Sequence, residues 1–185
     1  MKTTAYAAEI VKELHDSIER IAEEDAEKLA DGILRSGKVF VAGAGRSGLM
    51  GRAFAMRLMH SGIDAYVVGE TVTPGIGEND LLIIGSGSGE TKSLVSMAQK
   101  AKGLGAAVVA VTTAPESTIG RLADAAVKLP GSPKDREGSA KTTIQPMASL
   151  FEQTLLIFYD AVILGLMDKR GLDSGRMYGR HANLE

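Results

Sequence analysis

The sequence has no cysteine, few aromatic residues and no strong excess of charge. Without cysteine the chain can form neither disulfides nor thiolate metal sites, and catalysis by a cysteine nucleophile is excluded. A formal net charge of −2 argues against a protein that coats nucleic acid, because such proteins are normally basic. Aromatic residues make up 4% of the chain, so we do not expect aromatic stacking platforms.

Long hydrophobic runs are also missing from the middle of the chain. The apolar run from Leu81 to Ile84, like the others there, is far too short to span a bilayer. The N-terminus lacks the basic and then apolar pattern of a secretory signal. We therefore expect a soluble cytoplasmic protein without a membrane or nucleic-acid partner. A length of 185 residues fits one domain over 1–185 better than two.

Short apolar runs alternate with segments of helical period along most of the chain. Runs rich in valine, isoleucine and leucine predict strands over 38–42, 65–68, 80–84, 107–111 and 125–129. Helices are expected between them over 53–59 and 91–104. Strands that alternate with helices indicate an α/β fold with a parallel sheet covered on both faces.

Helical segments also flank the predicted sheet at both ends. Within residues 1–36, apolar residues from Tyr6 to Ile21 and a second stretch over 24–35 predict two helices that pack on the core or on a partner subunit. Residues 144–185 are expected to form a long helix over 145–169, with Pro146 in its first turn, and a tail. The polar stretch 131–141 is predicted to be an exposed loop.

Two glycine-serine loops follow the first and third predicted strands. Ligands of open parallel sheets collect at the carboxyl ends of strands, where glycine lets a helix N-terminus approach an anion closely. Serine and threonine hydroxyls add donors, and Arg46 adds a fixed positive charge, so a phosphate would need no metal there. The candidate binding residues are Gly45, Arg46 and Ser47 in the first loop and Ser86, Gly87, Ser88, Gly89, Glu90 and Thr91 in the second.

Other interpretations of these loops stay open at this point. Glycine after a strand often marks only a turn, and Ser88 or Thr91 could simply cap a helix. Gly43, Gly45 and Gly48 also satisfy the GxGxxG pattern of dinucleotide sites, with Glu70 placed to bind a ribose. Against a dinucleotide, the loop richer in hydroxyls follows the third strand, and the chain lacks the length for a separate substrate domain.

The loops GAGRSG and SGSGET together resemble the sugar isomerase (SIS) domain family. Longer strings are similar to one group of that family, the 6-phospho-3-hexuloisomerases: GRSGLMGRAFAMRLMHSG, VVGETVTPG, GSGSGETKSL, QPMASLFEQTLLIFYDAVI and the terminal RHANLE. The resemblance extends over nearly the whole chain. It implies a flavodoxin-like three-layer sandwich with a five-stranded parallel sheet.

The same resemblance implies an activity and an assembly. The activity is interconversion of D-arabino-3-hexulose 6-phosphate and D-fructose 6-phosphate through a cis-enediol(ate), the step after formaldehyde is fixed in the ribulose monophosphate pathway. Relatives form homotetramers with active sites near subunit boundaries and need no cofactor. The alternatives are a non-catalytic SIS-type phosphosugar sensor, an isomerase of another phosphosugar, or a nucleotide-binding oxidoreductase.

Glu152 is the candidate base for such a reaction. It lies near the start of the last predicted helix, and helical steps from it lead to Leu156, Tyr159 and Ile163. A carboxylate that heads a mostly apolar stripe needs a partner or a function, although an exposed glutamate near a helix start is common. The resemblance favours catalysis, because the matching glutamate is the proposed proton acceptor of the family.

The three histidines are distributed too widely to suggest a metal site. His15 lies beside the N-terminal apolar stripe and is expected at the surface or an interface. His60 ends a predicted helix, where a structural role is as well supported as a catalytic one. His181 lies in a C-terminal tail, and this position alone argues against a functional role. Related SIS isomerases extend a matching C-terminal histidine into a neighbouring subunit's site, so we take His181 and His60 as catalytic candidates.

Overall fold

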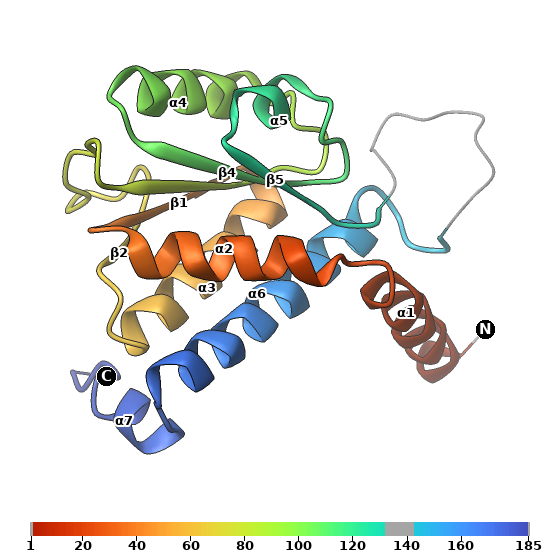
Figure 1. Cartoon of the computed structure of the whole chain (residues 1–185). Helices are drawn as coiled ribbons and strands as arrows, with labels where there is room; N and C mark the ends of the chain where they lie inside the picture. The colour runs from red at the N-terminus through yellow and green to blue at the C-terminus, as the bar shows by residue number, and fades with distance from the viewer. Residues whose placement is uncertain (1, 132–142, 185) are drawn as a thin grey trace.

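A five-stranded parallel sheet forms the centre of the computed structural model, which describes residues 2–131 and 143–184 (Figure 1). The strand order is β2-β1-β3-β4-β5, the flavodoxin-like arrangement that the sequence resemblance implies. The predicted α/β fold class is therefore confirmed. The strands are β1 (Val39–Gly43), β2 (Ala65–Val67), β3 (Leu81–Gly85), β4 (Ala107–Thr112) and β5 (Ala125–Lys128).

Helices cover both faces of the sheet and give the molecule three layers (Figure 1). One face carries α2 (Glu23–Arg35), α3 (Gly45–His60) and α6 (Ser149–Arg170), and the other carries α4 (Lys92–Gly103) and α5 (Thr118–Leu122). The N-terminal helix α1 (Thr3–Ile18) packs on α6, and the short α7 (Ser174–Tyr178) follows α6.

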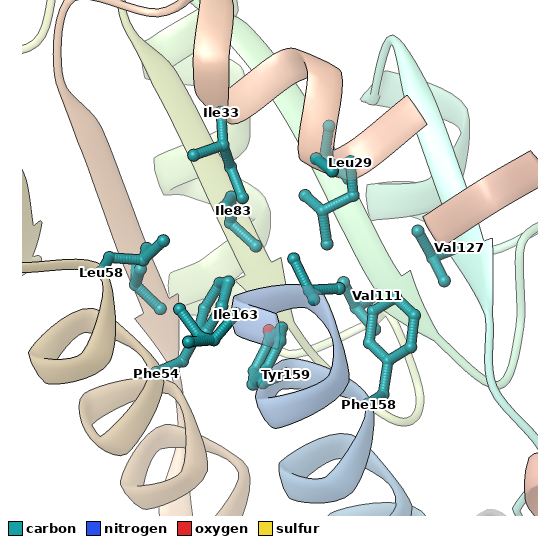
Figure 2. Packing of buried hydrophobic residues seen from close by; sticks show 14 of the residues in the cluster. Leu29, Ile33, Phe54, Leu58, Ile83, Val111, Val127, Phe158, Tyr159 and Ile163 are labelled. Carbon is teal, nitrogen blue, oxygen red and sulfur yellow. The ribbon is translucent and has the colours of Figure 1, made fainter. Parts of the chain in front are cut away.

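Alternation along the strands builds two hydrophobic cores, one on each side of the sheet. In β1, Val39 and Val41 face the layer of α2, α3 and α6, whereas Phe40 and Ala42 face α4 and α5. Figure 2 shows the larger core, in which the rings of Phe54 and Tyr159 stack with centroids 4.1 Å apart. Burial on both faces explains why the strands are almost continuously apolar in sequence.

Helix α6 meets the length and composition of a membrane span, unlike the short run considered in the sequence. Its most apolar window has a mean hydropathy of 1.6, but 56% of that window is buried inside the fold. Eleven of its residues are buried, and α6 packs directly against α3. Its apolar character is therefore accounted for by its place in the core.

Two helix starts differ from the prediction. Helix α3 begins at Gly45 rather than at residue 53. The sequence did not predict this start, because the glycines in the first two turns interrupt the apolar period. Helix α6 begins at Ser149 rather than at 145, so Pro146 precedes the helix instead of lying in its first turn. Met147 has a φ of 57°, a left-handed conformation that the first turn of an α-helix cannot contain.

The remaining differences concern short or terminal segments. Helices α5 and α7, each five residues long, were not predicted. Helix α1 ends at Ile18, before Ile21, and its Tyr6, Val11 and Ile18 are exposed, whereas α2 buries Leu29 and Ile33 in the core. The predicted loop over 131–141 lies, from residue 132 onward, outside the described residues.

The N-terminal part of α3 lies unusually close to the sheet. A Cβ atom at Gly48 would stand 2.6 Å from the carbonyl oxygen of Gly43, and one at Gly43 would stand 2.9 Å from the Cα of Gly48. Only glycine at both positions lets the two backbones touch. This contact fixes where the first turn of α3 lies relative to the end of β1.

The Gly48→Ala substitution is expected to lower the free energy of unfolding by about 1–3 kcal/mol, because its Cβ must displace backbone atoms. Urea titration of both proteins measures the difference. Gly103→Ala is the matched control, since a Cβ there meets nothing within 4 Å in the part of the chain that the structure describes, and alanine favours the helix. Equal stability of Gly48→Ala and wild type would contradict the close contact.

Candidate active site

The carboxyl ends of β1 and β3 lie side by side, as expected for a site between two loops. The register pairs Gly43 with Gly85, so the loops that follow these residues emerge next to each other at one edge of the sheet. Each loop leads directly into a helix, α3 and α4 respectively. The two sequence-predicted phosphate loops are therefore neighbours in space, and two helix N-termini point toward the same region.

The first loop enters α3 through Gly45, whose φ of 57° favours glycine. Arg46 and Ser47 follow in the first turn of the helix. The side chain of Arg46 is half exposed, with 51% of its surface accessible, so part of its guanidinium is open to a ligand. This turn therefore presents backbone N–H groups and one cationic side chain beside the second loop.

The backbone of the second loop is firmly held. The carbonyl oxygen of Gly87 accepts hydrogen bonds from the Thr113 N–H at 3.2 Å and from the hydroxyls of Thr112 and Thr113 at 3.1 and 2.7 Å. Gly89 has a φ of 63°, and a Cβ there would overlap the Ser117 hydroxyl. A loop fixed by this many contacts can hold an anion without first having to become ordered.

Three hydroxyls in the second loop retain a proton to donate. Ser86 Oγ accepts from the Gly89 N–H at 3.2 Å, and Ser88 Oγ accepts from the Glu90 N–H at 3.2 Å. These bonds use oxygen lone pairs, so each O–H remains able to donate to a phosphate oxygen. Thr91 occupies the N-cap position of α4 but makes no side-chain capping bond, so capping does not account for its hydroxyl.

Glu90 is engaged by the neighbouring helix α5. Its Oε1 accepts a hydrogen bond from the Thr118 N–H at 2.7 Å. The hydrogen bonds from Thr118, together with the charge of Arg121, lower the pKa of the Glu90 carboxyl. Its negative charge would oppose an anion, so the observed contacts favour a role in joining the loop to α5.

Glu152 is the buried acid of this region. Its side chain is 5% accessible and forms an ion pair with Arg46, whose Nη1 lies 3.1 Å from Oε2. The same Nη1 donates a hydrogen bond to the Ser149 hydroxyl at 2.9 Å. A buried carboxylate requires such a compensating charge. Because a guanidinium has five N–H donors, Arg46 can hold both partners and still donate to a bound oxyanion.

His60 and His181 lie together but far from Glu152 within one chain. Their rings stack with centroids 5.3 Å apart, and the ring of Tyr178 stacks on His181 with centroids 6.2 Å apart. His60 ends α3, whereas Arg46 lies in its first turn, so His60 stands roughly 22 Å from the start of a helix of this length. The structure thus divides the predicted catalytic residues into two groups.

Sequence reasoning missed Ser149, Thr112 and Thr113. Ser149 lies three residues before Glu152, and this helical spacing would have placed both on one face. The two threonines end β4 and follow it, so their position at a strand end was also readable. Among residues 2–131 and 143–184, no three His, Asp or Glu side chains gather to hold a metal ion.

Comparisons with known proteins find a matching family model and relatives that cover most of the chain. The SIS domain model matches residues 32–159. A 3-hexulose-6-phosphate isomerase of Bacillus subtilis (strain 168) is 62% identical over 185 residues, which are 100% of both chains. One of Mycobacterium gastri is 44% identical over 173 residues, 94% of this chain and 86% of its own. A Methanococcus jannaschii protein, with the inferred molecular function of 3-hexulose-6-phosphate isomerase, has a TM-score of 0.84 at 36% identity, covering 97% and 98% of the two chains.

The burial of His60 predicts a pH dependence of stability. Burial, together with the charges of Arg57 and His181, lowers the pKa of His60 below its usual 6.5. The folded state therefore favours the neutral ring, and the unfolded state binds more protons just below pH 6.5. The contribution of His60 to the free energy of unfolding is fully present above that pH. It falls as the pH decreases toward the folded-state pKa, by at most about 1.4 kcal/mol per pH unit for one group.

Urea titrations at pH 7.5 and 5.5 measure this effect. Wild type should lose more stability between the two pH values than His60→Gln, whose amide does not titrate. Parallel losses in the two proteins would contradict the assignment to His60.

Proposed function

This chain belongs to the SIS domain family, and we propose that it is an isomerase interconverting D-arabino-3-hexulose 6-phosphate and D-fructose 6-phosphate. The substrate assignment rests on the 62% identity to the B. subtilis 3-hexulose-6-phosphate isomerase over its full length. The reaction needs a base close to a phosphate-binding site. The buried acid Glu152, paired with Arg46 beside the two glycine-serine loops, fits the role of that base.

Substrate and product differ in which of two adjacent carbons carries the ketone. A base removes the proton from carbon 2 of the 3-hexulose, and the electron pair moves to form a carbon 2–carbon 3 double bond. The resulting enediolate then accepts a proton at carbon 3, while the proton of the carbon 2 hydroxyl passes to the oxygen on carbon 3. One carboxylate can serve both carbons if it stands beside them.

In this proposal the second loop binds the phosphate and Glu152 is the base. The hydroxyls of Ser86, Ser88 and Thr91 and the N-terminus of α4 supply donors for phosphate oxygens without a metal. Binding of the distant phosphate orients the carbon chain toward Glu152. Arg46 keeps the carboxylate in place and faces the negative charge that develops on the enediolate.

We also propose that each active site is shared between subunits of a homotetramer. Within one chain, His60 and His181 lie at the opposite end of α3 from Glu152, so they can act beside it only from another copy. Exposed apolar side chains on α1, among them Tyr6 and Val11, and Leu164 on α6 offer surfaces for such contacts. His181 would then move protons between the two sugar oxygens or assist ring opening.

The cellular setting follows from the substrate. Consumption of a 3-hexulose 6-phosphate places the reaction after the step that fixes formaldehyde in the ribulose monophosphate pathway, in assimilation or detoxification. Phosphorylated sugars are cytoplasmic metabolites, so we propose a cytoplasmic enzyme. The 185 residues would act as one SIS domain whose terminal helices, outside the matched residues 32–159, complete the site and the assembly.

Replacement of Glu152 by glutamine should lower kcat by about a thousandfold, within the range that a general base contributes. The amide keeps the size of the carboxylate and can still accept from Arg46, so the melting temperature should stay close to that of wild type. The measurement is fructose 6-phosphate formation from enzymatically prepared D-arabino-3-hexulose 6-phosphate.

Glu70→Gln provides the matched control. Glu70 forms a similar ion pair with another arginine of α3, Arg52, at 2.6 Å, and it is the residue that a dinucleotide site would have used. This variant should retain wild-type turnover. If wild type binds phosphosugars but does not turn over the 3-hexulose, a sensor or an isomerase of another sugar replaces the proposal.

Mixing two inactive variants tests the shared site. Glu152→Gln and His181→Gln should each be inactive alone, and mixed oligomers should regain activity because some sites draw an intact residue from each subunit. Random mixing in equal amounts gives about one quarter of the wild-type sites if one copy supplies each group. Full activity of His181→Gln alone, or no recovery in mixed oligomers, would contradict the shared site.

A further inference from the structure

We propose that Glu13, on the N-terminal helix α1, is a positioning residue that holds the chain leading into α6 and thereby places Glu152 for isomerisation. The inference rests on the proposed function, because it assigns Glu13 a part in the same reaction. It concerns a residue outside the two glycine-serine loops and outside the matched segment 32–159.

Both carboxylate oxygens of Glu13 are occupied by one short segment. Oε1 accepts a hydrogen bond from the Ile144 N–H at 2.7 Å. Oε2 accepts from the Thr143 hydroxyl at 2.6 Å and from Gln145 Nε2 at 2.9 Å. Thr143 Oγ1 in turn accepts from the Gln145 N–H at 3.0 Å. Three consecutive residues are therefore tied to a single side chain of a distant helix.

The carboxylate is suited to this task because it is ionised. Burial raises the pKa of Glu13, but the hydrogen bonds from Thr143, Gln145 and Ile144 outweigh that effect and lower it. At neutral pH the side chain is an acceptor only, so it can take all three donors at once.

The segment held by Glu13 runs directly into the candidate active site. Only residues 146–148 separate Gln145 from the start of α6, and Met147 among them has a left-handed backbone that fixes the direction of the turn. The Ser149 N–H donates to the Pro146 carbonyl at 3.1 Å, and the Glu152 N–H donates to the Ala148 carbonyl at 3.0 Å. Displacement of residues 143–145 would thus be transmitted to the first turn of α6.

That first turn carries the two groups that Arg46 binds, Ser149 and Glu152. Arg46 holds them from the side of α3, and Glu13 holds the preceding chain from the side of α1. A base must stand within a fraction of an ångström of its productive position, since a misplacement of about 1 Å can cost a hundredfold in rate. Loss of Glu13 should therefore lower kcat without removing any phosphate contact.

The structure also predicts which substitution can replace Glu13. The Oε1 atom of Gln145 is buried and has no hydrogen-bond partner among the described residues. If glutamine occupied position 13, rotation of the Gln145 amide would present this oxygen to the new NH₂ group, while the other oxygen at position 13 still accepts from Ile144. Glu13→Gln should therefore rescue what Glu13→Ala loses.

The experiment compares Glu13→Ala, Glu13→Gln and Glu9→Ala in the full chain. Glu9 lies one turn earlier on α1 and, among the described residues, makes only a 4.0 Å ion pair with Lys12, so it controls for loss of an acidic side chain. We expect Glu13→Ala to lose about tenfold or more in kcat with KM within about threefold of wild type. Glu13→Gln and Glu9→Ala should stay within about threefold of wild type in both constants.

Amide hydrogen exchange gives a second readout that needs no substrate. In Glu13→Ala the amides over 144–152 should exchange faster than in wild type, and those of β1 and β3 at the wild-type rate. Glu13→Gln should exchange like wild type throughout. Failure of wild type to turn over the 3-hexulose would overturn the proposed function but leave this readout intact. The inference is overturned if Glu13→Ala has wild-type kcat or wild-type exchange over 144–152, or if Glu13→Gln is as impaired as Glu13→Ala.

Discussion

The close contact between the backbones of β1 and α3 is the constraint on which the site depends. Glycine at positions 43 and 48 lets α3 begin almost on the sheet, and the register of β1 with β3 sets the second loop beside it. Arg46 then stands in the first turn of α3, within 3.1 Å of the carboxylate of Glu152 on α6. A bulkier residue at either glycine would move α3 outward and separate the two charges.

Because Glu152 is buried, it depends on the position of Arg46 that this geometry sets. An acid removed from water is tolerated only with a compensating charge and hydrogen bonds, and Arg46 supplies the charge from a position that is still half exposed. The second loop is fixed by Thr112, Thr113 and the contact of Gly89 with Ser117. Glu13 on α1 holds the chain that precedes α6 by accepting a hydrogen bond from the Ile144 N–H. The site is therefore organised before substrate binds, which favours orientation of a small phosphosugar over induced closure.

The sequence was most informative where burial on two faces leaves a simple signature. The five strands are nearly continuous apolar runs, so their positions were predicted to within about a residue or two. Helix starts were harder, because glycines in the first turns of α3 hide its period and Pro146 suits a preceding turn as well as a first turn. The pairing of Arg46 with Glu152 joins residues far apart in sequence, and no local pattern encodes it. Assignment of the sugar came from resemblance over the whole chain, since the glycine-serine loops alone indicate only the SIS domain family.

Deuterium incorporation into D-fructose 6-phosphate, incubated with the protein in heavy water, tests the proposed reaction most directly. If Glu152 transfers the proton between carbons 2 and 3, nuclear magnetic resonance will detect deuterium at carbon 3 of the sugar and not at carbon 1. The Glu152→Gln variant will then leave the sugar unlabelled. Label at carbon 1 would indicate an aldose-ketose isomerase, and label at carbon 3 with Glu152→Gln at the wild-type rate would show that another residue is the base.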